Sequence, residues 1–163
     1  MTNESKTLFI PLYGKAMMSK RGFFPDETAE KIVDTCGHDF TDVDKSEKLA
    51  IYMAMRAKHY DELCEQFLTK YPDSIVIHLG CGLDSRCRRV ERTPKMWYDL
   101  DFPDVIDIRK KYYKESMNYT MIPSSVTDFL CLGTYSNSCS SASISTGADT
   151  VSYDISGEIT AVG

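Results

Sequence analysis

The sequence predicts an α/β fold in which parallel strands alternate with helices after a helical N-terminal region. Short apolar runs at about 75–79, 96–100 and 119–123 are separated at the spacing of a β-α-β-α-β unit. The first run ends in a Gly-x-Gly loop at 80–82, which is how a parallel strand meets a ligand at its carboxyl end. The chain has 163 residues, 42% of them hydrophobic and 26% charged, which suits one globular core.

Two helices are predicted before the first strand. Asp26 is the expected N-cap of the first, because Ala29, Ile32, Val33 and Cys36 follow it at helical spacing, and Gly37 is the expected stop. The second is expected to run from near Ser46 to Tyr71 and to end at Pro72. The residues of this second helix expected to share one core-facing stripe are Leu49, Tyr52, Met53, Arg56, Tyr60, Leu63, Phe67 and Leu68.

Arg56 is the charged exception in that stripe. An unpaired buried guanidinium is unfavourable, so Arg56 needs a carboxylate partner. Either an acid of the same helix, Asp61 or Glu62, or the carboxylate of a ligand satisfies this requirement. The residues alone leave both possibilities open.

A further helix is predicted from Pro103 to Tyr113, between the second and third strands. Proline is tolerated in a first helical turn, and Val105, Ile106 and Ile108 provide an apolar face. The basic residues that follow, Arg109, Lys110 and Lys111, are expected to be exposed.

The glycine loop and Asp101 together indicate a nucleoside cofactor. Asp101 lies 19 residues after Gly82 and closes the second strand, where a carboxylate accepts hydrogen bonds from a ribose diol. Ser85 stands where a dinucleotide fingerprint needs its third glycine, and no Gly-Lys-Ser or Gly-Lys-Thr run is present for a phosphate loop. The pattern therefore suits S-adenosylmethionine, which carries a ribose and an amino acid end but no phosphate.

From about Thr7 to Phe129 the chain resembles the leucine carboxyl methyltransferase and related O-methyltransferase family. The matching stretches are Leu12-Tyr13-Gly14-Lys15-Ala16, Met55-Arg56-Ala57, His78-Leu79-Gly80-Cys81-Gly82-Leu83-Asp84-Ser85-Arg86 and Tyr98-Asp99-Leu100-Asp101-Phe102-Pro103. The resemblance implies a Rossmann-like class I methyltransferase sheet with N-terminal helices at 1–72 and a cofactor-binding part at 73–129. It also implies cofactor-binding roles for Arg56, Gly80, Gly82, Asp101 and Asp99.

The resemblance implies that Arg56 binds the carboxylate of the cofactor and that Asp101 binds its ribose. Asp99 lies two residues before Asp101 on the same strand face and is the alternative for the ribose. A cap before Pro103 is the other possible role of Asp101. No catalytic residue is predicted, because His59 and Tyr60 have no feature beyond those of ordinary helix residues.

The function implied is transfer of a methyl group from S-adenosylmethionine to an oxygen of a small molecule or protein, either a carboxylate or a hydroxyl. A non-catalytic cofactor-binding remnant is the alternative, and an NAD-dependent oxidoreductase is a further one. Placement of the two reactants can supply most of the catalysis, roughly 7 to 11 kcal/mol, without a dedicated base when the acceptor is a carboxylate.

Other functional classes find little support in the sequence. The six cysteines form no CxxC pair, so free thiols and no metal site are expected. No membrane span or signal peptide is present, which predicts a cytoplasmic protein, and oligomeric state is not predicted. Nucleic acid is not an expected partner, because acids interrupt the basic cluster, which is interpreted as a solvated helix face: Arg86, Arg88, Arg89, Arg92 and Lys95.

The composition changes after Phe129. All 19 basic residues lie at or before Lys114, and residues 130–163 contain eight serines, four threonines and four glycines. This segment is expected to be a poorly ordered tail, although residues 150–153 could pair with an open sheet edge. The C-terminal half of the family is therefore expected to be missing through truncation or a frameshift, which predicts weak cofactor binding and little turnover.

Overall fold

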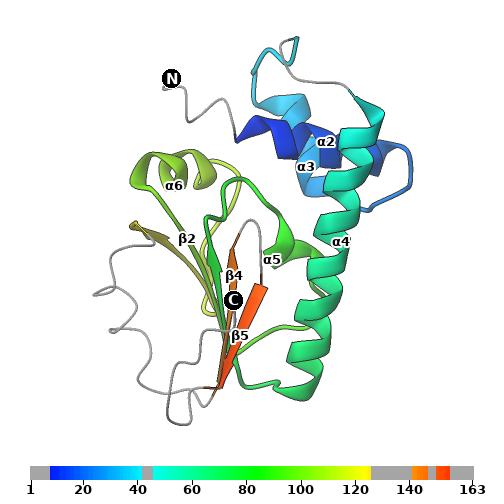
Figure 1. The fold of residues 1–163 in the computed structure, drawn as a ribbon. Coiled ribbons are helices and arrows are strands. Elements are labelled where there is room, and N and C mark those ends of the chain that lie inside the picture. Colours follow the sequence, from blue (N-terminus) through cyan, green and yellow to red (C-terminus); the bar gives the residue numbers. More distant parts are fainter. Residues whose placement is uncertain (1–7, 42–45, 126–140, 147–149, 155–163) are drawn as a thin grey trace. The chain divides into compact units, whose positions relative to one another are not determined.

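The computed structural model describes residues 8–41, 46–125, 141–146 and 150–154 (Figure 1). They fall into two compact units. One is formed from the ranges Met1–Leu63 and Leu83–Glu91, and the other from Cys64–Gly82 and Arg92–Gly163. The first unit is helical and the second contains the sheet.

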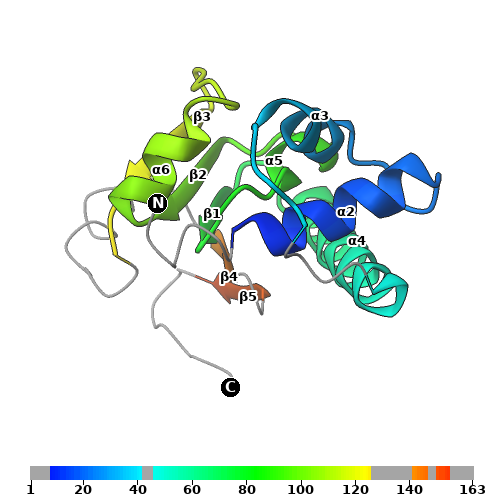
Figure 2. The ribbon, with the colours of Figure 1, turned by 90° about the horizontal axis from the view of Figure 1, so that it is seen from above.

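The first unit begins with helices α2 (Phe9–Lys20) and α3 (Glu27–Thr35), which pack against each other (Figure 2). The predicted start and stop of α3 are confirmed. The Asp26 carboxylate accepts a hydrogen bond from the Ala29 backbone N–H at 2.9 Å, and Gly37 has a φ of +65° just beyond the helix. The N-terminal helical region was predicted, but α2 was not predicted as a separate element.

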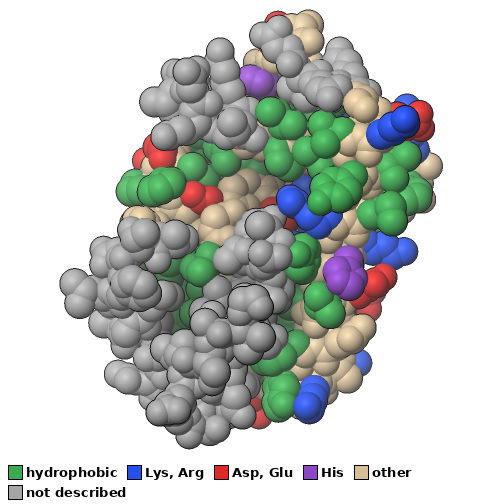
Figure 3. Space-filling view, viewed as in Figure 1, with side chains coloured by type: hydrophobic (Ala, Val, Ile, Leu, Met, Phe, Trp, Pro, Cys, Tyr) green, Lys and Arg blue, Asp and Glu red, His purple; other side chains and the backbone are tan. Residues whose placement is uncertain are grey.

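The long helix α4 (Glu47–Lys70) has the predicted length but buries a different face. Its buried positions follow helical spacing and are mostly small: Ala50, Ala54, Ala57, Cys64 and Leu68. Tyr52 is 62% exposed and Leu63 is 36% exposed, so the predicted stripe of large residues was wrong at these positions. Figure 3 shows hydrophobic side chains gathered along this helix on the surface.

The second unit is built on three parallel strands, β1 (Ile75–Leu79), β2 (Met96–Asp101) and β3 (Tyr119–Pro123). All three lie where the apolar runs predicted them, with β2 one residue longer. Ile77 pairs with Tyr98, and Tyr98 with Thr120, so β2 lies between the other two. The Rossmann-like α/β prediction is therefore confirmed for this part of the chain.

Helix α6 (Pro103–Arg109) follows β2 and packs against β2 and β3 (Figure 2). It begins at Pro103 as predicted but ends four residues before Tyr113. A turn replaces the last predicted turn of helix, and the Tyr113 backbone N–H donates to the Arg109 carbonyl at 3.0 Å. Arg109 is also fully buried, so its predicted exposure was wrong.

Two further strands extend the sheet. Strand β4 (Ser141–Thr146) pairs in parallel with β1, and β5 (Thr150–Asp154) pairs antiparallel with β4, giving the order β3-β2-β1-β4-β5. Residues 150–153 therefore pair with β4, whereas the sequence predicted no element here and at most pairing with an open edge. Most of the predicted tail lies outside the described residues.

The described residues show neither a disulfide bond nor a helix that could cross a membrane. Cys36, Cys64, Cys81 and Cys87 are not joined in disulfide bonds, and Cys131 and Cys139 lie outside the described residues. None of the helices in the described ranges combines the length and apolar character that crossing a membrane requires.

Candidate functional site

The glycine loop begins where β1 ends. Because β1 and β2 are parallel, their carboxyl ends meet at one edge of the sheet, and the Gly80 N–H donates to the Leu100 carbonyl at 2.8 Å. Gly80 has a φ of +63°, which favours glycine, and it is exposed. No heavy atom lies within 4 Å of the position that a Cβ would take, so a ligand can approach the backbone here closely.

Asp101 closes β2 beside this loop. Its Oδ2 accepts a hydrogen bond from the Gly82 N–H at 2.7 Å, and its Oδ1 accepts one from the Phe102 N–H at 2.8 Å. The N-cap of α6 is Phe102, so Asp101 does not cap that helix. The carboxylate is only half-buried, and each oxygen has lone-pair capacity left for a ligand hydroxyl.

Asp99 lies in different surroundings although it is on the same strand face. It is fully buried, and its carboxylate accepts hydrogen bonds from Trp97 Nε1 at 2.8 Å and from the Tyr119 hydroxyl at 2.7 Å. It also pairs with Arg109 and contacts His78 Nδ1 at 3.2 Å. A cofactor could reach Asp99 only by breaking this network, so the structure gives it an internal role.

The charge of Asp99 is held by its partners. Burial by itself raises the pKa of a carboxyl group, but the Arg109 guanidinium and the hydrogen bonds from His78 and Tyr119 outweigh it. The pKa of Asp99 therefore lies well below its ordinary value of 3.8. Burial lowers the pKa of Arg109, but the ion pair with Asp99 outweighs this effect and holds the pKa well above its ordinary value.

Arg56 lies on α4 and is half-buried. Within the described ranges, no ion pair joins Arg56 to an acid. Asp61, one of the two structural partners considered, instead accepts hydrogen bonds from Arg86 at 3.0 Å and Arg89 at 2.6 Å. These contacts remove one structural explanation for Arg56 and leave its guanidinium available to a ligand carboxylate.

Arg86 and Arg89 were expected on a solvated helix face, and this prediction was wrong. They lie on the short helix α5 (Arg86–Arg89), with only 5% and 8% of their side chains exposed. Arg89 donates to Asp61, to Asp26 at 2.8 Å and to Asp84 at 2.9 Å. Asp26 and Asp61, which are distant in sequence, and the nearby Asp84 thus neutralise these two arginines.

Lys15 joins the same cluster from α2, and sequence reasoning did not single it out. Its Nζ donates to Asp84 at 2.7 Å, and its side chain is 6% exposed. Burial lowers the pKa of Lys15 more than the Asp84 carboxylate raises it. The only signal in the sequence was its position inside the Leu12–Ala16 stretch used for the family resemblance.

Ser85 occupies the position where a dinucleotide-binding loop has its third glycine. Its side chain is fully buried, and its hydroxyl donates to Asp26 at 2.6 Å while accepting from Arg89 at 2.5 Å. A dinucleotide fingerprint needs a glycine here to leave room for a pyrophosphate. The position is instead filled by a hydrogen-bonded side chain.

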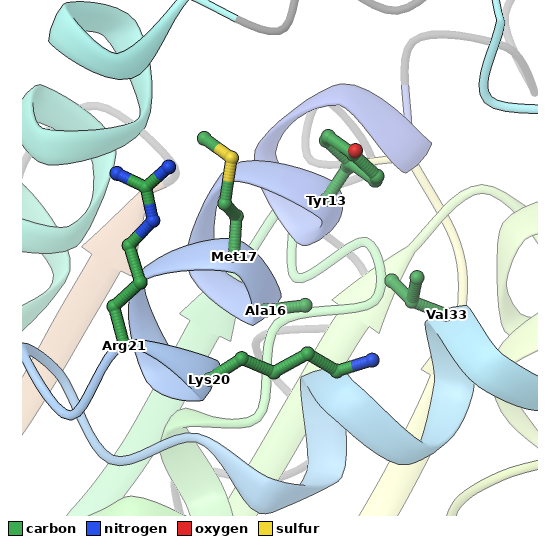
Figure 4. A pocket seen from close by; sticks show the side chains of 6 residues that line it. All are labelled: Tyr13, Ala16, Met17, Lys20, Arg21 and Val33. Atoms are coloured by element: carbon green, nitrogen blue, oxygen red, sulfur yellow. The ribbon is translucent and has the colours of Figure 1, made fainter.

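A separate pocket of about 210 Å³ lies between α2 and α3 in the first unit (Figure 4). Its walls include Tyr13, Met17 and Val33, and Figure 4 shows Lys20 extending towards Val33 while Arg21 points away from it. Lys20 pairs with Asp34 and Arg21 with Glu47, so neither cation is left for an anionic ligand. None of the predicted site residues lines this pocket.

Metal chemistry has no visible basis in the part of the chain that the structure describes, where no group of three or more His, Cys, Asp or Glu side chains could hold an ion. Of the predicted residues, the second unit contains the glycine loop and the Asp101 carboxylate, and the first unit contains Arg56. Gly80, Gly82 and Asp101 lie together at the carboxyl edge of the sheet.

Comparisons with known proteins find matches over most of the chain. The sequence profile described as "Leucine carboxyl methyltransferase" matches residues 6–127, which ends close to the predicted boundary at Phe129. "Tetracenomycin polyketide synthesis O-methyltransferase TcmP" of Streptomyces glaucescens is 36% identical over 130 residues, covering 78% of this chain and 48% of that protein. "S-adenosyl-L-methionine-dependent methyltransferase dpfgK" of Gibberella zeae is 32% identical over 127 residues, covering 71% and 43%. The chain thus spans about half the length of these relatives.

Proposed function

Because the chain belongs to the leucine carboxyl methyltransferase family, we propose that it forms the cofactor-binding part of a methyltransferase acting on an oxygen of a small molecule. The cofactor is S-adenosylmethionine, on which the relative from Gibberella zeae depends according to its name. When bound, that cofactor supplies an electrophilic methyl group on a sulfonium. The match covers 48% and 43% of the length of these two relatives, so the complete activity is part of the proposal.

The observation that carries the proposal is the placement of Asp101. Its half-exposed carboxylate lies at the end of β2 and is oriented by the Gly82 N–H at 2.7 Å. Asp101 would accept hydrogen bonds from the ribose diol, and the exposed backbone at Gly80 would allow the ligand to approach. We propose this role for Asp101 rather than for Asp99, whose oxygens are engaged inside the protein.

Arg56 is proposed to bind the carboxylate of the cofactor's amino acid end. A guanidinium is suited to this because it can form two parallel hydrogen bonds with a carboxylate. Partial burial strengthens such a pair relative to one in open water. The support is that Arg56 matches the family's motif and forms no ion pair in the described ranges.

Oxygen as the acceptor is supported by the name of one relative, an O-methyltransferase of polyketide synthesis. A carboxylate or phenolate acceptor is already nucleophilic, so orientation of the two reactants can carry most of the rate enhancement. No residue of this chain is assigned as a base. Recognition of the acceptor is likewise assigned to no residue in the described ranges.

The test is calorimetric titration of the chain with S-adenosylhomocysteine and, separately, with NAD. We expect binding of S-adenosylhomocysteine only. Asp101→Asn and Arg56→Ala should each weaken it roughly 10- to 100-fold, because a hydrogen bond to a charged group contributes about 1.5 to 3 kcal/mol. Binding without methyl transfer would identify this chain as a binding part, whereas turnover would show that it is sufficient.

Matched controls lie close to the two residues in the sequence. Asp104 in the first turn of α6 and Lys58 on α4 are exposed, so Asp104→Asn and Lys58→Ala should leave the affinity unchanged. Tighter binding of NAD would contradict the proposal. So would full affinity for S-adenosylhomocysteine in both Asp101→Asn and Arg56→Ala.

A further inference from the structure

Arg109 is the buried cation of the second unit, and its guanidinium contacts three different elements. Its Nη2 pairs with Asp99 on β2, and its Nε donates to the Tyr119 hydroxyl on β3 at 3.2 Å. The plane lies over the Tyr113 ring with the carbon of the guanidinium 3.9 Å from the ring centroid. The remaining contact leaves this network, because Nη1 donates to the carbonyl of Gly82 at 2.8 Å.

Gly82 is thereby held on both sides. Its N–H donates to Asp101 at 2.7 Å, and its carbonyl accepts from Arg109 at 2.8 Å. The φ of Gly82 is +49°, in the left-handed region that glycine adopts readily, and without a Cβ its backbone is freer to move than that of other residues. A charged side chain on each side therefore fixes the loop at the point where Asp101 is oriented.

We propose that Arg109 is a positioning residue of the cofactor site, which acts through the Gly82 backbone to orient Asp101. It touches no ligand itself, since its side chain is fully buried. The carbonyl and the N–H of Gly82 belong to successive peptide groups that meet at its Cα, so holding the carbonyl limits how far this residue can move. The N–H that donates to Asp101 is restrained with it, and that N–H orients the carboxylate that would meet the ribose. This inference rests on the proposed function, because the cofactor is what Asp101 would bind.

The alternative is that Arg109 only stabilises the fold. For that role the contacts with Asp99, Tyr119 and Tyr113 would be enough. These contacts compensate the buried charge without involving the loop. The hydrogen bond to Gly82 is additional, and it is the part of the arrangement that connects the end of α6 with the loop after β1. The two roles therefore differ in whether Arg109 and Asp101 are energetically coupled in ligand binding.

A double-mutant cycle on the affinity for S-adenosylhomocysteine tests that coupling. Arg109→Lys keeps the charge beside Asp99 but lacks the planar fork, and we expect it to weaken binding roughly ten-fold. In the Asp101→Asn background the same change should have little further effect. Tyr119→Phe is the structural control, because it removes hydrogen bonds within the network without touching Gly82, and it should leave the affinity unchanged.

The backbone amide resonance of Gly82 gives a second measurement that needs no ligand. The amide shift should change in Arg109→Lys and remain in place in Tyr119→Phe. If Arg109→Lys does not fold, Asp99→Leu/Arg109→Met leaves no uncompensated charge, and it should show the same amide change and loss of affinity.

The outcomes separate the two proposals. No binding of S-adenosylhomocysteine by the wild-type chain would count against the proposed function. Wild-type binding with full affinity and an unmoved Gly82 amide in Arg109→Lys would overturn the positioning role alone. Equal losses in the wild-type and Asp101→Asn backgrounds would likewise show that Arg109 acts independently of Asp101.

Discussion

Replacing Arg89 by leucine should destabilise the first unit strongly. Its guanidinium is the shared partner of three carboxylates, with Nε donating to Asp61 at 2.6 Å and Nη1 donating to Asp26 at 2.8 Å and to Asp84 at 2.9 Å. The loss of Arg89 affects these three acids differently, because two of them keep another ion-pair partner. Asp61 retains Arg86 and Asp84 retains Lys15, whereas Asp26 forms no other ion pair within the described ranges.

The expected magnitude follows from Asp26. Its side chain is 1% exposed, so water cannot replace the lost guanidinium. Removing one partner of a buried ion pair costs about 3 to 5 kcal/mol, because a buried charge is left uncompensated. Urea unfolding followed by circular dichroism should show this loss in the free energy of unfolding, with Arg88→Leu as the matched control on the more exposed side of α5.

Asp26→Asn in the Arg89→Leu background should recover part of the loss. An asparagine side chain at this position could still accept from the Ala29 N–H, as Asp26 does at 2.9 Å, but it would carry no charge. The reasoning is refuted if Arg89→Leu is no more destabilising than Arg88→Leu. It is also refuted if the second substitution adds its own loss instead of restoring stability.

Two further predictions concern the loop and the buried carboxylate. Gly80→Ala and Gly37→Ala meet the same strain, since φ is +63° and +65° and the space is open at both, so each should cost about 1 to 2 kcal/mol of stability. Only Gly80→Ala should also weaken binding of S-adenosylhomocysteine, and equal affinities in the two variants would argue against a ligand at this loop. Asp99→Asn should be destabilising at neutral pH, because the depressed pKa of Asp99 contributes stability above about pH 4 that is lost as the pH falls towards the folded-state pKa. The difference in unfolding free energy between this variant and the wild type should shrink by about 1 kcal/mol from pH 5 to pH 3, and a constant difference would exclude the linkage.

The strands and helix ends were predictable because their signals are local. Apolar runs bounded by turn residues placed β1, β2 and β3, and a capping carboxylate with a following glycine placed α3. The buried face of α4 was missed because Ala50, Ala54 and Ala57 carry a weak hydrophobic signal. The larger exposed residues Tyr52 and Leu63 dominated the pattern instead.

The electrostatics of the site could not be predicted from sequence in the same way. Asp99 and Asp101 share a strand face, and a period of two cannot distinguish them. The structure separates them because α6 and β3 bring Arg109 and Tyr119 onto Asp99, whereas Asp101 lies at the strand end beside the loop. The burial of Arg109 likewise depends on partners that local spacing does not reveal.

The cluster around Arg89 affects the order in which the chain can fold as it is synthesised. Asp26 and Asp61 emerge from the ribosome with the first helices, but Ser85, Arg86 and Arg89 belong to a later segment of the same unit. Until that segment emerges, Asp26 and Asp61 lack their arginine partners, so the first unit cannot form these buried ion pairs. The N-terminal helices therefore mature only after β1 has been made, and a fragment that stops before Leu83 would not contain a finished folding unit.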